Sequence, residues 1–406
     1  MDQQSIQYDV IIIGGGMVGA SLVAALKNHS TIKIAVVEAV PFKSDSQPSF
    51  DDRSIALSYG SRRIFESMGL WKKLEAEIEA IKAIHVSDKG YLGATRLHHS
   101  EENVEALGYV AENKVLGKLL MSEVDGLSHV DWYSPATIES LQKDENNVSV
   151  KIKTTDKNIL LESRLLVAAD GVHSKTRQLA GIDVKQDDYK QAAVITNVQT
   201  DQLHLGIAYE RFTENGPIAF LPMTENRYSV VWTCKQDDVQ RVIKLNDDEF
   251  KNELQSRFGF RAGNIQKLGE RFSYPLVYTE AKQLTKDRVV IIGNAAHALH
   301  PVAGQGYNLA LRDVAELSEL IVNAADPGND LLLADYHANR YKDIQKVHTV
   351  TDSLVKVFSN NISLLGHARA MGLICVDLIA PVRSLMARQS MGLLGRMNKL
   401  QRRLPL

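Results

Sequence analysis

The sequence predicts a mixed α/β fold, in which a nucleotide-binding domain is interrupted by a strand-rich domain and followed by a helical segment. Residues 8–38 read strand, turn, helix, strand, and a glycine-rich turn follows the first strand. Short apolar strands return at 160–169 and 289–292, on either side of a strand-rich stretch at 192–233. Because buried parallel strands are short and almost continuously apolar, these runs predict one sheet assembled from distant segments.

The composition is that of a globular protein of two to three domains. Of its 406 residues, 44% are hydrophobic and 24% are charged, which is enough for a sizeable core. The net charge of -2 gives no electrostatic case for nucleic acid. No leader and no apolar run of about 20 residues is visible, so we expect no membrane-spanning helix. Cys234 and Cys375 lie outside any metal or redox motif, which predicts free thiols in a reducing, cytoplasmic compartment.

The glycine turn has the spacing of a dinucleotide-binding motif. Gly14, Gly16 and Gly19 lie between the first strand and the first helix, and Glu38 ends the second strand. In a Rossmann-like domain the first glycine permits the tight turn, the second lets a pyrophosphate approach the backbone, and the third lets the helix pack closely on the strand. The helix N-terminus attracts phosphate, and Glu38 can accept hydrogen bonds from ribose hydroxyls. This motif alone does not distinguish FAD from NAD.

Two later motifs follow further apolar strands. Asp170 and Gly171 end one strand just before a helix start, which could also be a simple turn with Ser174 near a helix N-cap. Glycines at the start of the next long helix would again allow close backbone approach to a ligand. The candidate ligand contacts in this third motif are Asn294, Pro301, Gly304, Gln305, Gly306 and Asn308. A helix N-terminus aimed at a flavin would favour the negative charge of the reduced ring.

Together the three motifs resemble those of the group A flavoprotein aromatic hydroxylases, which have the p-hydroxybenzoate hydroxylase fold. The resemblance runs from Tyr8 to about Tyr341. It implies an FAD-dependent monooxygenase that uses NAD(P)H as co-substrate and O2, through a flavin C4a-hydroperoxide, to hydroxylate an aromatic ring. The first motif and Glu38 would hold the ADP part of FAD, Asp170 and Gly171 would serve FAD and NAD(P)H, and the third motif would hold the ribityl chain and pyrophosphate beside the isoalloxazine.

The resemblance carries further expectations for single residues. It places Arg53 near the flavin, although two acidic neighbours also fit a solvated loop arginine. Where the family often has an arginine near FAD, this chain has Asn113 or Lys114. Because the flavin carries the chemistry, we expect no catalytic side chain and no metal site. His297 and His300 have the spacing of a metal pair, but no third ligand is suitably spaced, so His297 is predicted to be structural.

A narrower resemblance rests on the third motif. Most of the family has Gly-Asp where this chain has Gly293-Asn294, and Asn can hydrogen-bond a ribityl hydroxyl without bringing a negative charge. This motif and the segments 52–57 and 84–90 resemble the 2-polyprenyl-6-methoxyphenol hydroxylases of ubiquinone biosynthesis. The resemblance implies a polyprenyl phenol substrate and a place in a ubiquinone-biosynthesis protein complex. Two alternatives stay open, a hydroxylase of a small soluble aromatic acid and a non-catalytic flavin-binding subunit of a biosynthetic complex.

The predicted domains are discontinuous in sequence. The FAD-binding domain takes residues 1–75, 111–185 and 283–352, the substrate-binding β-sheet domain takes 76–110 and 186–282, and an amphipathic helical segment takes 353–406. Within the first part, residues 54–74 are predicted to be helical. In the β-sheet domain the candidates for the ring pocket are Tyr209, Arg211, Phe220 and Tyr228, and packing in the core fits each of them as well.

The C-terminal segment differs from the rest in charge. From Gly366 onward it has seven Lys and Arg residues and one acidic residue, Asp377. Amphipathic helices broken near Pro381 would suit the surface of an anionic membrane or a partner protein, and a helical cap on the FAD-binding domain is the alternative. We therefore expect a cytoplasmic protein, with peripheral contact at the inner face of the cytoplasmic membrane as one of these outcomes.

Overall fold

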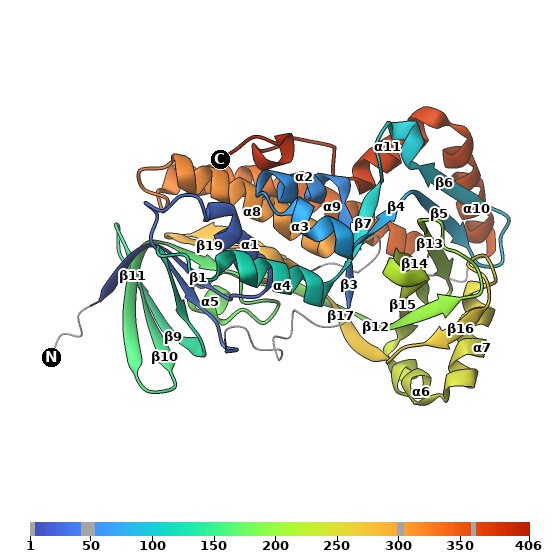
Figure 1. The fold of residues 1–406 in the computed structure, drawn as a ribbon, viewed down its shortest axis with the longest axis horizontal. Coiled ribbons are helices and arrows are strands. Elements are labelled where there is room, and N and C mark those ends of the chain that lie inside the picture. Colours follow the sequence, from blue (N-terminus) through green and yellow to red (C-terminus); the bar gives the residue numbers. More distant parts are fainter. Residues whose placement is uncertain (1–4, 42–52, 299–303, 359–362) are drawn as a thin grey trace.

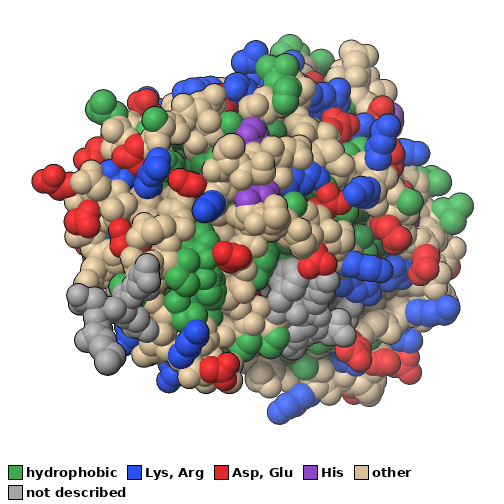
Figure 2. All heavy atoms as spheres, turned by 60° about the vertical axis from the view of Figure 1, so that its left-hand side comes forward, with side chains coloured by type: hydrophobic (Ala, Val, Ile, Leu, Met, Phe, Trp, Pro, Cys, Tyr) green, Lys and Arg blue, Asp and Glu red, His purple; other side chains and the backbone are tan. Residues whose placement is uncertain are grey.

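The structure is a computed structural model that describes residues 5–41, 53–298, 304–358 and 363–406, and it confirms the mixed α/β class. Two large sheets lie toward opposite ends of the long axis, and helices cover both (Figure 1). A small third sheet, made of β3 (Ser54–Ser58), β7 (Gly108–Glu112) and β4 (Glu79–Ile81), joins the two regions. Charged side chains of both signs are interspersed over the face seen in Figure 2, in keeping with a net charge near zero.

The first large sheet is the predicted α/β sheet. Its strand order is β18-β19-β11-β1-β2-β8, and β10 and β9 extend it from β11. Its strands are β1 (Ile6–Ile13), β2 (Ile34–Val37), β8 (Val130–Tyr133), β9 (Ala136–Lys143), β10 (Val148–Thr154), β11 (Asn158–Ala168), β18 (Thr285–Lys286) and β19 (Val289–Ile291). Five of these, from β19 to β8, run parallel. In register, Ile13 lies opposite both Val37 and Ala168, so β1, β2 and β11 end at one edge of the sheet.

Helices on this sheet bury its apolar strands in one core. α1 (Met17–Leu26) packs against α4 (Asn113–Val124) and α8 (Gln305–Asn323), and α8 packs in turn against α9 (Asp330–Phe358). The side chains of β1 and β2 that enter this core, such as Ile11, are fully buried. The burial of so many aliphatic side chains fixes the edge at which the strands end.

The prediction of a helix over 54–74 is wrong in its first five residues. Ser54–Ser58 form strand β3, which pairs with β7 (Gly108–Glu112), and β7 pairs with β4 (Glu79–Ile81). The helices α2 (Tyr59–Ser67) and α3 (Trp71–Leu74) follow, and the Ser58 side chain caps α2 by accepting from the Ser61 N–H. These residues are extended because they pair with a strand about 50 residues away in the sequence. Local propensity does not contain that information.

The second large sheet has the order β20-β17-β12-β15-β14-β13-β5-β6, with β16 on β12. Its strands are β5 (Ala83–Asp88), β6 (Ala94–His98), β12 (Val184–Thr200), β13 (Ile207–Thr213), β14 (Gly216–Met223), β15 (Arg227–Lys235), β16 (Ile265–Leu268), β17 (Phe272–Ala281) and β20 (His297–Ala298). α6 (Val239–Lys244) and α7 (Asp247–Phe258) cover one face over a core of aromatic side chains. The other face is turned toward the rest of the molecule.

The C-terminal helices cover the second sheet rather than the first. α9 continues without a break through residue 352, and α10 (Ser363–Leu378) and α11 (Ala380–Ser390) follow. The helix break lies at Ile379, next to Pro381 in the first turn of α11. α10 packs on β5 and β6 and α11 on β6, whereas the turn at 400–402 packs on α2 (Figure 1).

Among the described residues, no single helix is long and apolar enough to cross a membrane. The pair Gly366–Leu378 and Ala380–Ser390 passes that test together, but the two helices meet at a bend of 96°.

Candidate active site

The three sequence motifs meet because their strands end at one edge of the first sheet. The glycine turn follows β1, Glu38 follows β2, Asp170 follows β11, and Gly293 follows β19. Backbone hydrogen bonds tie these ends together: the Gly14 N–H donates to Val37 over 2.8 Å, and the Ala169 N–H donates to Ile13 over 2.7 Å. Ligands of open parallel sheets bind at this carboxyl edge.

The glycine turn leaves no room for side chains. Gly14 has φ +101°, and a Cβ there would lie 2.5 Å from the Ala169 carbonyl oxygen. A Cβ on Gly19 would lie 1.9 Å from the Gly14 carbonyl oxygen, so α1 can pack on the turn only through glycine. The Glu38 carboxylate accepts the Gly15 N–H at 2.6 Å and the Val40 N–H at 2.9 Å, which fixes the turn's shape beside the cavity.

The Asp170 carboxylate precedes the short helix α5 (Lys175–Leu179) in sequence and accepts hydrogen bonds from its first turn and its N-cap residue. The carboxylate accepts the Thr176 N–H at 3.1 Å and the Thr176 hydroxyl at 2.8 Å, and it also accepts from the Ser174 hydroxyl. Ser174 is the N-cap residue, as the simple-turn interpretation has it. From α5 the Arg177 guanidinium donates to the Ala295 carbonyl over 2.8 Å, which connects the second motif to the third.

A buried ionic network holds the third motif. Asp313 of α8 accepts the Gly293 N–H at 3.0 Å, contacts His297 Nε2 at 2.6 Å, and accepts from Arg340 of α9 at 2.7 Å. Burial by itself would raise the pKa of Asp313, but the neighbouring His297 and Arg340 and the backbone N–H lower it to about 2. His297 therefore has a structural partner, while His300 lies outside the described residues. Among the described residues, no group of three His, Cys, Asp or Glu could hold a metal ion.

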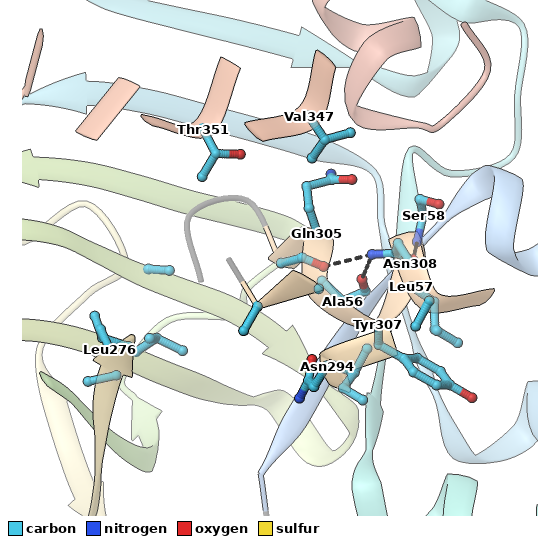
Figure 3. A pocket seen from close by; sticks show the side chains of 18 of the residues that line it. Ala56, Leu57, Ser58, Leu276, Asn294, Gln305, Tyr307, Asn308, Val347 and Thr351 are labelled. Atoms are coloured by element: carbon cyan, nitrogen blue, oxygen red, sulfur yellow. Dashed lines mark hydrogen bonds between the residues drawn. The ribbon is translucent and has the colours of Figure 1, made fainter. Parts of the chain in front are cut away.

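The start of α8 presents residues of the third motif to the cavity (Figure 3). Asn308 donates to the carbonyls of Ala56 and Gly304, both at 2.7 Å, and accepts from the Ser58 N–H and the Ser61 hydroxyl. Its carboxamide thus joins α8 to β3 and α2. Asn294, Gln305 and Tyr307 surround the same space, and Val347 and Thr351 project toward it from α9.

Eleven of the thirteen predicted cofactor contacts line one cavity of about 1750 Å³. They are Gly14, Gly16, Glu38, Arg53, Asp170, Gly171, Asn294, Gly304, Gln305, Gly306 and Asn308. Gly19 packs α1 on the turn instead, and Pro301 lies outside the described residues. The Arg53 guanidinium lies 4.4 Å from the centre of the Tyr274 ring, across the junction of the two sheets. The cavity exceeds the roughly 300–1,000 Å³ of a usual ligand site, which leaves space for a dinucleotide and a second ligand.

The cavity wall suits the phosphates of a dinucleotide such as FAD. α1 and α8 both begin at glycines, Gly16 and Gly304, and neither helix has a side-chain cap. Their first N–H groups and positive dipole ends are therefore available to anions. A Cβ on Gly306 would meet no atom of the described residues within 4 Å, so their packing does not require glycine there, whereas a ligand against that backbone would.

Comparison with known proteins identifies the family. A family model described as "FAD binding domain" matches residues 7–351. The chain belongs to this FAD-binding family. Ubiquinone hydroxylase UbiL of Rhodospirillum rubrum is 36% identical over 391 residues, which cover 95% of this chain and 90% of that protein. The 3-demethoxyubiquinol 3-hydroxylase of Escherichia coli is 28% identical, and the match covers 95% of this chain and 98% of the relative.

The solved structures agree on the fold. The crystal structure of p-nitrophenol 4-monooxygenase PnpA from Pseudomonas putida has a TM-score of 0.79 at 16% identity and covers 97% of this chain and all of that one. Together with the family match, these relationships confirm the predicted FAD-dependent monooxygenase, and they relate the chain to the ubiquinone hydroxylases over almost its full length.

The second half of the cavity is lined by the inner face of the second sheet. Of the four aromatic and basic candidates there, Phe220 and Tyr228 are buried in the outer core against α7, and Arg211 extends toward Gly259 on that side. Tyr209 borders the cavity, but its hydroxyl donates to the Arg261 carbonyl at 3.2 Å. The sequence analysis missed Glu210, which lines the cavity between Ala208 and Phe212. Strict alternation along β13 is the signal that could have found it.

Proposed function

We propose that this chain hydroxylates the aromatic ring of a polyprenylated phenol in ubiquinone biosynthesis, with 2-polyprenyl-6-methoxyphenol as the substrate and NAD(P)H and O2 as co-substrates. The carrying observation is that the cofactor cradle and a largely apolar chamber form one cavity, in a chain related over 95% of its length to a ubiquinone hydroxylase. FAD bound at the glycine turns would supply the reduction by nicotinamide and the activation of oxygen.

The protein's own residues position the reactants. The strand ends and helix N-termini bind the dinucleotide, and the apolar inner face of the second sheet excludes water from the ring. The row of Ile195, Val231, Ala219 and Val86 supplies that face. No side chain needs to form a covalent bond to the substrate in this scheme.

An isoprenoid tail fits the far end of the cavity. There the lining comes from α9, α10 and α11, and it includes Leu354, Leu373, Val376, Leu385 and Met386. Leu385 and Met386 have 57% and 39% of their area exposed. We infer that the cavity opens beside α11, where a tail could continue into an apolar phase.

The same helices support peripheral contact with the cytoplasmic membrane. On the same helices, Met371, Leu378 and Ile379 are exposed apolar side chains of α10 and of the break that follows it. Contiguous exposed apolar side chains are typical of interaction surfaces. Of the basic residues nearby, Arg369 and Arg383 are engaged with Asp88 and Glu101, so the contact proposed here depends more on apolar insertion than on charge. A ubiquinone-biosynthesis complex is the other occupant that this surface could have.

The test uses the purified holoenzyme with NADH or NADPH and a short-tailed 2-prenyl-6-methoxyphenol. We expect nucleotide oxidation that depends on this phenol and a product one oxygen heavier by mass spectrometry, whose ring position is read from fragmentation. A soluble aromatic acid turned over in preference to the prenylated phenol would replace this function with the alternative. Retained flavin without any oxidation of nucleotide would indicate a non-catalytic subunit. In cells, deletion of the gene should accumulate a prenylated phenol that lacks one ring oxygen.

A further inference from the structure

One row across the inner face of the second sheet carries a single ionisable side chain. The strand register sets Ile195, Val231, Ala219, Glu210 and Val86 side by side on β12, β15, β14, β13 and β5. All five line the cavity. Because residues in register on neighbouring strands point to the same face, the Glu210 carboxylate stands among apolar neighbours on the wall of the substrate chamber.

The Glu210 carboxylate has no protein partner among the described residues, for which neither a hydrogen bond nor an ion pair to it is found. On the neighbouring strand β5, Asp88 is already held by Arg369 at 2.8 Å. The residue is half-buried because one side of it borders the cavity, while its removal from bulk water raises its pKa to about 7. Unpaired carboxylates in apolar surroundings are costly for stability and are retained where they act on a ligand.

We propose that Glu210 binds the hydroxyl group of the phenolic substrate and accepts its proton as the ring is oxidised. This inference rests on the proposed function, because it assigns the phenol end of that substrate to one residue. The phenolic O–H donates a hydrogen bond to the Glu210 carboxylate. When the proton moves, the phenol O–H bond breaks, a Glu210 O–H bond forms, and the electron pair stays on the phenol oxygen. The resulting phenolate is the more electron-rich ring, and no oxidant is needed for this step.

The position of Glu210 also sets the orientation of the ring. With the hydroxyl on β13, one flank of the ring lies toward β14 and β12 and the other toward β5 and the C-terminal helices that line the tail end of the cavity. A phenol whose tail is adjacent to its hydroxyl suits this arrangement, in which Glu210 positions the ring as well as accepting its proton.

The experiment combines two substitutions with two ligands in the holoenzyme. Glu210→Gln keeps the shape and the hydrogen bond but cannot take a proton, so kcat should fall by about 10²–10⁴-fold with little change in KM. Glu210→Leu removes the hydrogen bond as well. Wild type should bind 2-methoxyphenol about 10- to 100-fold more tightly than 1,2-dimethoxybenzene, which cannot donate, and Glu210→Leu should lose this preference. Bound ligand is measured by the change in flavin fluorescence.

The control is Glu225→Gln, an exposed carboxylate in the same domain, which should leave kcat and the binding preference unchanged. Flavin content and melting temperature of each variant verify the fold. Glu210→Gln with a kcat close to wild type, or Glu210→Leu with the wild-type preference for the phenol, would overturn the assignment. Wild type that fails to oxidise the prenylated phenol would overturn the proposed function instead, and the binding preference would still decide the role of Glu210.

Discussion

The two ends of the cavity are built by opposite means. At the cofactor end, polar groups are hydrogen-bonded to one another: Glu38 to the glycine turn, Asp170 to α5, and Asp313 to Gly293, His297 and Arg340. At the substrate end, a row of aliphatic side chains surrounds one carboxylate, for which the described part of the chain offers no partner. A ligand with many phosphate and hydroxyl groups needs a preformed polar site. A phenol with an apolar tail needs an apolar cavity that excludes water and offers a polar contact to the hydroxyl.

The largest effect on folding and flavin content is expected from a substitution at the most closely packed glycine of the cofactor end. In Gly19→Val, the new side chain would collide with the Gly14 backbone, since even a Cβ would lie 1.9 Å from its carbonyl oxygen. We expect loss of folded, flavin-containing protein on expression. Gly69→Ala is the control, because no atom of the described ranges lies within 4 Å of a Cβ there, although its positive φ adds a small strain. Recovery of yellow Gly19→Val protein with wild-type stability would show that α1 does not rest on this turn.

The buried network at the third motif should come next in effect. Asp313→Asn removes the carboxylate that accepts from Arg340 and the Gly293 N–H and leaves Arg340 with Asp343 as its remaining acidic partner, so it should cost about 1–3 kcal/mol in the free energy of unfolding. Because the folded pKa of Asp313 is depressed to about 2 from 3.8, its ionised form stabilises the fold above the higher value. That contribution is lost as the pH falls through about 2. Chemical denaturation between pH 7 and pH 2 measures both effects, and Asn323→Asp at the exposed end of α8 is the control helix substitution.

A substitution at Gly306 separates cofactor contact from folding. Because a Cβ there meets no atom within 4 Å in the part of the chain that the structure describes, Gly306→Ala should leave the melting temperature of the apoprotein unchanged. If the dinucleotide lies against this backbone, the FAD dissociation constant should rise by about tenfold, which corresponds to about 1.4 kcal/mol. Fluorescence titration of apoprotein with FAD gives the constant. An unchanged constant would remove Gly306 from the cofactor contacts.

The smallest effect is expected at the opening beside α11. Leu385→Asp places a charge on an exposed apolar position and should reduce co-sedimentation with vesicles of phosphatidylglycerol and phosphatidylcholine by about threefold to tenfold. Activity on a short-tailed substrate in solution should stay at the wild-type level. Leu331→Asp is the control at another exposed apolar position, at the start of α9, where Leu331 is 80% exposed. Equal sedimentation of both variants would contradict lipid contact at α11.

The sequence predicts the cofactor end well because its geometry is local. Gly14, Gly16 and Glu38 belong to one strand-turn-helix-strand unit, so the spacing of the motif is sufficient to predict where each residue lies. β3 was mistaken for helix because its partner, β7, lies about 50 residues away. Glu210 could not be predicted in the same way as Gly14 or Glu38. Its place on the cavity wall depends on the register of five strands, and residue type alone favoured Tyr209 and Phe220. The place of α10 and α11 on β5 and β6 is likewise a matter of tertiary packing.

The order of strands in the first sheet has a consequence for synthesis of the protein. β19 joins the sheet beside β11, yet about 120 residues separate Ala168 from Val289 in the chain. At roughly 5–20 residues per second, a ribosome needs roughly 6–24 s to make that stretch. During this interval the carboxyl end of β11 is without its β19 partner while strands β12 to β17 of the second sheet emerge. The binding site for FAD is therefore completed late, and a nascent chain depends on rapid folding of the inserted sheet, or on chaperones, to keep that strand edge from pairing with another chain.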